Sequence, residues 1–390
     1  MSARKRPSNS LSSAPPAPAS KASASNHSRV VSSAQSIRKR RTASLMRFSL
    51  RGFAIAACLG LTGCYYGHLA EGQLRMMWRA RPIDTVLTDP DTPDDVRSML
   101  ARVEDVRSFA AELGLTVEGQ YTSYVDWPGD RIVTTLVRTR EGSVETVPWR
   151  YPILGALPYK GFFERPRAES EAERLRENAY QVCVSGVSAY STLGWIDDPV
   201  TQPMLARGPS ALVETLFHEL VHATAFVPGE AAFNEGVAQF IGQQAAIRFF
   251  EQNPPSDATP EDWPDATKVR DAIHDRALIA ERTLAFREAV EALEGVENRE
   301  RKRAEAEATF RDALAAMPLA VYDAGQVAKS ARLSDPCLAL RGTYVRDAPR
   351  HAAVLASLGR DLPAMIERLA RWADEERDVQ AFFEIGVPEN

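Results

Sequence analysis

His218-Glu219-Leu220-Val221-His222 is the stretch that decides how this 390-residue chain is interpreted. Residues four apart in a helix lie on the same face, one turn from each other. The chain has only six histidines, and two of them have this spacing. Two imidazoles so placed can bind one Zn²⁺, and Glu219 can act as general base on the water that the metal holds. The pattern predicts metal-assisted amide hydrolysis.

A catalytic zinc ion usually has three protein ligands and one water. Glu235 follows a turn at Pro228-Gly229, which allows a second helix to fold back beside the first. We therefore predict Glu235 as the third ligand, with an ordinary surface glutamate as the alternative. His274 and His351 are poorer candidates, because they lie in charged helical stretches that are typical of a surface.

Apolar side chains surround the two histidines, which favours burial of this helix. They are Leu212, Val213, Leu216, Phe217, Leu220 and Val221. The imidazoles are then the polar groups that need partners. A pair of core histidines bonded to the backbone is the alternative interpretation. The sequence has no G-x-S-x-G motif, no Walker-type glycine loop and no paired C-x-x-C, so it offers no rival catalytic pattern.

The N-terminal part has the features of an export signal. Residues 1–45 are rich in Ser, Ala and Pro, and they are either a disordered extension or lie upstream of the true start at Met46. Residues 46–63 contain a basic start, a short apolar run and small residues, in the order of a signal peptide. Leu61-Thr62-Gly63-Cys64 resembles the lipobox of bacterial lipoproteins, which implies cleavage before Cys64 and lipidation of that residue. A buried helix with an incidental cysteine is the alternative.

This signal predicts a protein of the bacterial cell envelope that faces the periplasm and contacts the membrane through a lipid on Cys64. No nucleic-acid partner is expected, because the formal net charge is −5. Cys183 and Cys337 remain in the mature chain. An exported protein allows them to form a disulfide, but they are equally compatible with two small buried hydrophobes.

The order of sequence patterns predicts an α+β fold that is mainly helical, with a small mixed or antiparallel sheet before the motif helix. Short strands rich in β-branched and aromatic residues are expected at 121–124, 131–137, 144–148, 159–163 and 181–187. We expect the motif helix to be capped by Ser210. Further helices are expected at 233–250, at 268–317 as one long helix or a pair interrupted by Gly295, and at 350–383.

Residues 63–383 resemble a family of predicted bacterial aminopeptidases, which are zincin-like lipoproteins of the gluzincin type. The resemblance rests on Gly63–Tyr66, Tyr159–Phe163, Ala189–Trp195 with Asp197-Asp198-Pro199, the His218–His222 motif and Phe233–Glu235. It implies one zincin-like peptidase domain over residues 64–390 with a C-terminal helical region. It also implies a Zn²⁺ cofactor bound by His218, His222 and Glu235. The chain departs from the family's pattern at Ala223 and Gly236, which concerns specificity rather than metal binding.

The resemblance also implies how a peptide substrate is held. In zincin folds an edge strand pairs with an extended substrate, and Ala189–Gly194 is the candidate here. Tyr190 would then donate its hydroxyl to the oxyanion, although an interior strand with a buried tyrosine fits as well. Glu230 would bind the substrate α-amine, or be a plain surface glutamate. The expected activity is zinc-dependent removal of N-terminal residues. The alternative is a non-catalytic envelope chaperone or assembly lipoprotein that binds extended chains.

Overall fold

The computed structural model describes residues 63–151, 155–188, 197–253, 263–341, 346–375 and 378–384. The chain divides into two compact units, Met1–Tyr66 and Gly67–Asn390, and the second contains nearly all of the described residues. The predicted extension at 1–45 and the signal peptide up to residue 62 lie outside the described part. No helix within the described ranges is both long enough and apolar enough to cross a bilayer.

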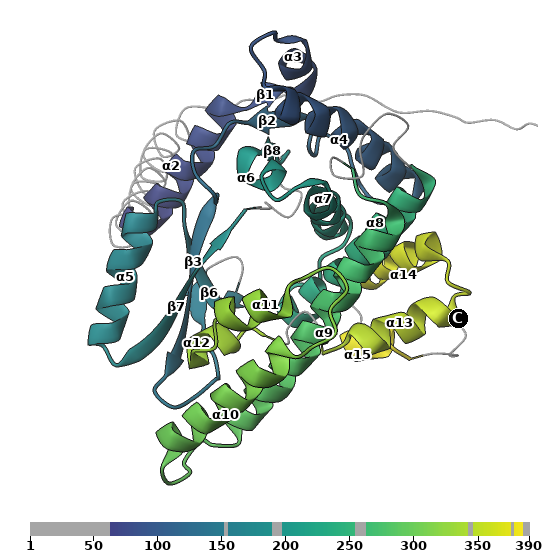
Figure 1. Ribbon diagram of the computed structural model, residues 1–390. Coiled ribbons are helices and arrows are strands. Elements are labelled where there is room, and N and C mark those ends of the chain that lie inside the picture. The colour runs from purple at the N-terminus through teal and green to yellow at the C-terminus, as the bar shows by residue number, and fades with distance from the viewer. Residues whose placement is uncertain are drawn as a thin grey trace, which may run out of the picture. The chain divides into compact units, whose positions relative to one another are not determined.

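Helices make up most of the described chain (Figure 1). The helices before the metal motif and the helix that contains it are α2 (Gly63–Arg79), α3 (Ile83–Thr88), α4 (Asp94–Glu112), α5 (Arg165–Glu177), α6 (Gln202–Leu205) and α7 (Pro209–Thr224). Those that follow are α8 (Ala231–Gln252), α9 (Ala266–Glu291), α10 (Arg299–Ala315), α11 (Ala324–Ser330), α12 (Asp335–Leu338), α13 (Ala348–Ser357), α14 (Leu362–Asp374) and α15 (Val379–Phe382).

The described strands are short and precede α7. They are β1 (Arg81–Pro82), β2 (Ser123–Val125), β3 (Val133–Arg140), β4 (Trp149–Tyr151), β5 (Gly155–Leu157), β6 (Tyr159–Phe162), β7 (Tyr180–Val187) and β8 (Val200–Thr201). Together with the helices they confirm the predicted α+β class. The expected single sheet is instead three separate small ones, ordered β1-β2-β8, β6-β3-β7 and β4-β5.

The sheet around β3 is antiparallel throughout, whereas the sheet around β2 is mixed, because β2 pairs antiparallel with β1 and parallel with β8. The strand expected at 144–148 is wrong. That segment makes only one isolated bridge, Thr139 to Thr146, and β4 begins at Trp149. Both α5 and α12 pack against β3 and β7. A disulfide joins Cys183 of β7 to Cys337 of α12, which answers the question that the sequence left open.

The main core surrounds α7, which packs against α4, α6 and α8 (Figure 1). All six apolar residues expected to bury this helix are less than 9 % exposed. Phe109 of α4, Phe217 of α7 and Phe249 of α8 meet edge to face, with ring centroids 5.6–6.0 Å apart. Such aromatic pairs add to the stabilisation that burial alone provides. The motif helix is therefore fixed on several sides.

Several helical predictions hold and two details do not. Residues 268–317 form the pair α9 and α10, separated near Gly295, whose φ of +72° suits a residue without a side chain. α7 begins at Pro209 with Gly208 as its N-cap, so Ser210 lies inside the helix and does not cap it. His351 was expected at the surface, but it is fully buried in an aromatic cluster. Its charged neighbour in α13, Arg350, is exposed.

Candidate metal centre

The two histidines of the motif lie on one face of α7, as the spacing predicts. Their Nε2 atoms are 3.1 Å apart, and the imidazole planes are nearly perpendicular. His222 is buried and the side chain of His218 is 15 % exposed, so the pair lies at the edge of the core rather than on open surface. Both nitrogens therefore face the same small volume.

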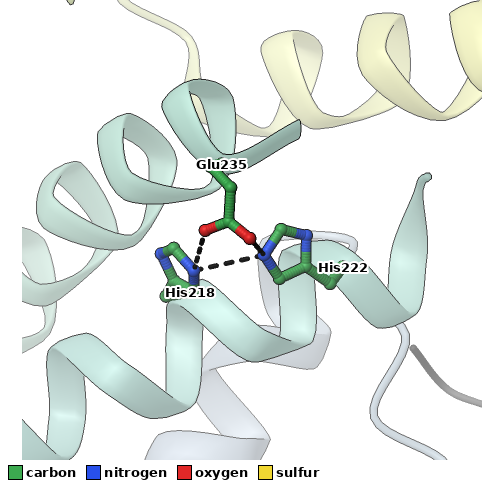
Figure 2. A group of neighbouring side chains, drawn as sticks. All are labelled: His218, His222 and Glu235. Carbon is green, nitrogen blue, oxygen red and sulfur yellow. Dashed lines mark hydrogen bonds and ion pairs between the residues drawn. The ribbon is translucent and has the colours of Figure 1, made fainter. Parts of the chain in front are cut away.

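Glu235, the fifth residue of α8, comes to this volume from the N-terminal part of that helix (Figure 2). The turn between α7 and α8 contains Gly229 at a φ of +84°, a conformation that favours glycine. The buried Asn234 amide fixes this turn on both sides. Its Oδ1 accepts from the Val227 N–H at 2.9 Å, and its Nδ2 donates to the Val227 carbonyl at 2.8 Å. The neighbouring Glu235 is thereby directed back towards α7.

The three ligand atoms have a spacing that suits a metal ion. Glu235 Oε2 is 3.5 Å from His218 Nε2, and Glu235 Oε1 is 3.8 Å from His222 Nε2. Tetrahedral Zn²⁺ with bonds of about 2.1 Å places its ligands about 3.4 Å from one another. One ligand atom from each residue lies within 4.8 Å of the other two. The donor set of two imidazoles and one carboxylate thus fits a zinc-type site with one position left for water.

Gly242 brings the two helices close together beside His218. A Cβ at this position would lie 3.0 Å from the His218 backbone nitrogen, 3.2 Å from its Cα and 3.3 Å from the Glu214 carbonyl oxygen. These are backbone atoms, which cannot rotate away. Gly242 is two helical turns after Glu235, on the same face of α8. The absence of a side chain here sets the separation of α7 and α8 on which the ligand spacing depends.

The ionisable groups of this cluster shift one another's pKa values. Burial would raise the pKa of Glu235, but its ion pairs with the two histidines hold that pKa well below its usual range. Burial alone would lower the pKa of His218, and the paired carboxylate of Glu235 together with nearby Glu219 raises it instead. Nδ1 of His222 has no hydrogen-bond partner among the described residues. Helix packing, rather than a second hydrogen bond, therefore orients that ring.

Comparison with known protein families supports a peptidase assignment. A family model described as "Putative aminopeptidase" matches residues 64–381, which is most of the chain. The chain belongs to this family. No curated protein and no solved structure gives a significant match. The matched region includes both helices of the metal centre and extends through the C-terminal helices.

A second layer of charged residues lies beside the centre, and the sequence analysis did not identify it. Glu214 is one helical turn before His218 and forms an ion pair with Arg276 of α9. It also accepts from Gln239 Nε2 at 2.7 Å. Arg276 donates in turn to the Tyr322 hydroxyl at 3.0 Å. The i−4 spacing of Glu214 was visible in the sequence, whereas the arrival of Arg276 from a distant helix was not.

The loop that carries Tyr322 is held by one buried carboxylate. Asp275, which is 1 % exposed, accepts from the backbone N–H groups of Ala320, Val321 and Tyr322 at 2.7–3.1 Å. Burial would raise the pKa of Asp275, but these three hydrogen bonds lower it. Val321 and Tyr322 stay partly exposed at the tip. The loop is therefore rigid at its base and presents two large side chains to solvent.

Tyr121 lies near Glu219 in an unusual backbone conformation. It is 3 % exposed and has a φ of +59°, which is uncommon for a large side chain. Its backbone N–H donates to the Asp198 carbonyl at 2.8 Å. Burial raises the pKa of its phenol well above the usual value, and the charges of Glu219 and Asp198 raise it further. The phenol therefore keeps its proton. Nothing in the sequence reveals a positive φ at this residue.

The remaining predicted residues have different places. Glu219 is half-buried on α7, next to His218. Glu230 is the exposed N-cap residue of α8 and makes no side-chain capping bond, so the structure does not bring it into the ligand cluster. Tyr190 and the rest of segment 189–196 lie outside the described residues. Cys64 is the second residue of α2.

Proposed function

We propose that this protein is a zinc-dependent aminopeptidase of the bacterial cell envelope with a zincin-like catalytic domain. One observation carries the proposal: ligand atoms of His218, His222 and Glu235 lie within 4.8 Å of one another, with Glu219 directly after the first histidine. The family description "Putative aminopeptidase" supports the reaction class. The metal and the substrate are inferred from the chemistry of these residues, and the location is inferred from the sequence before Cys64.

Zinc is the metal that best suits two imidazoles and one carboxylate in this small volume. When bound, it supplies Lewis acidity, which lowers the pKa of water and polarises a carbonyl. In the metal-free protein the interactions with His218 and His222 lower the pKa of Glu235, so this carboxylate is ionised. Zinc would take the place of the protons on the two imidazoles, because a ligand histidine must be neutral. Glu214 and Arg276 form a charge pair next to the ligand His218 and so balance each other.

Glu219 is the proposed general base. It takes a proton from the attacking water and passes it to the leaving amine as the peptide bond breaks. Its place on α7 fits this role, because it follows His218 on the same rigid helix and is only half-buried. The water oxygen becomes part of the new carboxylate, and the amine leaves with the transferred proton.

Exopeptidase action requires a group that holds the free α-amine of the substrate. We assign this role to Glu230, an exposed carboxylate at the start of the helix that carries Glu235. Tyr190 is proposed as the hydroxyl donor to the developing oxyanion. The proposed location rests on the signal pattern before Cys64. The disulfide between Cys183 and Cys337 supports it, because such bonds persist in oxidising compartments.

Three measurements on purified protein test this function. Metal analysis should give about one zinc per chain, because the described residues contain one three-ligand cluster. Hydrolysis of peptides with a free N-terminus should exceed that of N-blocked peptides and stop with chelator. Glu219→Gln should retain zinc and lose hydrolysis, while Glu281→Gln, an exposed glutamate on α9, should match the unaltered protein.

Each measurement has an outcome that rejects part of the proposal. Cleavage of blocked peptides alone would exclude the aminopeptidase assignment while keeping the zinc. A protein that binds zinc and extended peptides, but shows no hydrolysis that Glu219→Gln removes, would be a binding module such as an envelope chaperone. Protein without bound zinc after gentle purification would exclude the metallopeptidase.

A further inference from the structure

One face of α2 carries large apolar side chains that nothing in the described structure covers. Leu74, Met77 and Trp78 are 48 %, 49 % and 84 % exposed. Their spacing places them together on one side of the helix. The earlier residues on that side, Gly67 and Ala70, are small and also exposed. Among described residues, these three are the most exposed of the large hydrophobic side chains.

The opposite side of α2 is fixed against the domain, so the exposed face has no freedom to turn inward. The His68 Nε2 accepts the Phe163 N–H at 3.1 Å, and Met76 is buried. Gly72 packs so closely that a Cβ there would lie 2.1 Å from the Phe163 ring. Arg75 lies over the Trp127 ring at 4.8 Å. These contacts determine which side of the helix points away from the protein.

We propose that this outer face of α2 lies on the surface of a lipid bilayer, with Leu74, Met77 and Trp78 inserted at the level of the headgroups. Amphipathic helices bind membranes in this way, with tryptophan at the boundary and basic residues near the phosphates. Arg79 follows Trp78 directly and is exposed at the end of the helix. Arg81, two residues later, is also exposed and forms an ion pair with Asp89 at 2.7 Å. Only one acidic residue, Glu71, lies on the same face.

The size of the patch argues for a bilayer rather than a protein partner. The three side chains expose roughly 400 Å², about half of the ~800 Å² that each partner buries in a standard protein interface. A bilayer sets no such minimum, because it can accept a few side chains at its surface. The patch is thus too small for a stable second copy and sufficient for interfacial contact.

The proposed lipid on Cys64 is a second argument that this face of α2 contacts a bilayer. Trp78 follows Cys64 by fourteen residues within the same continuous helix. Stable membrane attachment generally takes two signals rather than one. In this respect the inference rests on the proposed envelope location, but it does not depend on peptidase activity. Contact along α2 would fix the orientation of the domain that a lipid alone would leave free.

The test uses the mature chain from residue 64 with Cys64→Ser, so that no acyl chain contributes. Residues from Gly67 onward form a compact unit with its own core. Its binding to vesicles of phosphatidylethanolamine and phosphatidylglycerol is measured by co-sedimentation. The combined variant Leu74→Ser, Met77→Ser and Trp78→Ser should bind at least about tenfold more weakly. Val187→Ser, which removes an exposed apolar side chain elsewhere, should bind as the parent does.

Tryptophan fluorescence provides an independent measurement. Vesicles should shift the emission of the parent to shorter wavelength, and Trp78→Phe should remove most of this shift, because Trp78 is the most exposed of the described tryptophans. Trp127, Trp263 and Trp372 are buried, and Trp149 is half-buried. Circular dichroism and thermal melting check that each variant is folded. Equal vesicle binding by the parent and the triple variant would overturn the proposal.

A concentration-dependent dimer that the triple variant abolishes would also overturn it, because the face would then bind a second copy. The vesicle assay contains no peptide substrate. A protein that binds vesicles through α2 but hydrolyses nothing would reject the peptidase and retain this inference.

Discussion

Gly242→Ala tests whether the spacing of α7 and α8 controls metal binding. The new Cβ would lie 3.0 Å from the His218 nitrogen and 3.3 Å from the Glu214 carbonyl oxygen. Carbon atoms in ordinary contact are about 3.5–4.0 Å from their neighbours. The helices must therefore separate by roughly 0.5 Å at this point. Because Glu235 lies on the same face of α8, it moves away from His218 with the helix.

Two effects of opposite sign act on stability. Overpacking costs about 1–3 kcal/mol, whereas replacing glycine by alanine inside a helix returns about 1 kcal/mol. We expect Gly242→Ala to reduce the free energy of unfolding of the metal-free protein by about 0–2 kcal/mol. Zinc affinity should fall more steeply, by about 10- to 100-fold, because ligand positions tolerate displacements of only about 0.2 Å.

The assay is urea unfolding with and without zinc, combined with zinc titration against a chelator of known affinity. Gly67→Ala is the matched control, because a Cβ at this helical position meets nothing within 4 Å. It should raise stability by about 0.5–1 kcal/mol and leave zinc affinity unchanged. Unchanged zinc affinity in a folded Gly242→Ala protein would refute the reasoning, since the close packing would then have no bearing on the ligands.

Three further predictions concern the pH response, the disulfide and the turn between α7 and α8. Burial lowers the pKa of His351 from 6.5 to about 4. The stability that depends on this neutral imidazole is therefore fully present above pH 6.5 and is lost as the pH falls towards 4. The loss should reach about 3 kcal/mol in urea unfolding, and His351→Phe should remove this pH dependence. Replacing Cys183 and Cys337 by alanine should lower stability by about 2–5 kcal/mol in chemical unfolding, and added reductant should then have no further effect. Asn234→Ala should cost about 2–3 kcal/mol and weaken zinc retention during dialysis, because the backbone groups of Val227 lose both partners; unaltered retention would contradict the role given to this amide.

The local part of the metal centre could be predicted from sequence because helical spacing is a short-range rule. Helical spacing correctly predicted that His218 and His222 share one face of α7 and that apolar side chains bury the rest of the helix. Glu235 was within reach for a related reason, since a turn followed by a second helix returns the chain to its neighbour. All three residues lie within eighteen positions of one another.

What sequence patterns did not reveal depends on contacts between distant segments. Arg276 forms an ion pair with Glu214 from a helix that begins more than forty residues later, and no local sequence pattern predicts this contact. His351 appeared to belong to a charged surface helix, yet its face packs against Phe233, Phe240 and Phe383. The sequence did not decide whether Cys183 and Cys337 form a disulfide, because pairing depends on their distance in space. One sheet was expected and three small ones were found, because amino-acid composition predicts strands but does not specify which strands pair.

The disulfide also gives the oxidised chain a circular topology. The bond between Cys183 and Cys337 closes a ring of backbone, and its sequence separation of 154 residues encloses His218, His222 and Glu235. The supporting residues Glu214 and Arg276 lie inside the same ring. A single proteolytic cut anywhere in this ring leaves every metal ligand attached to one covalent molecule. Such a cut would thus nick the oxidised protein without separating its ligands, whereas the same cut in reduced protein yields two free fragments.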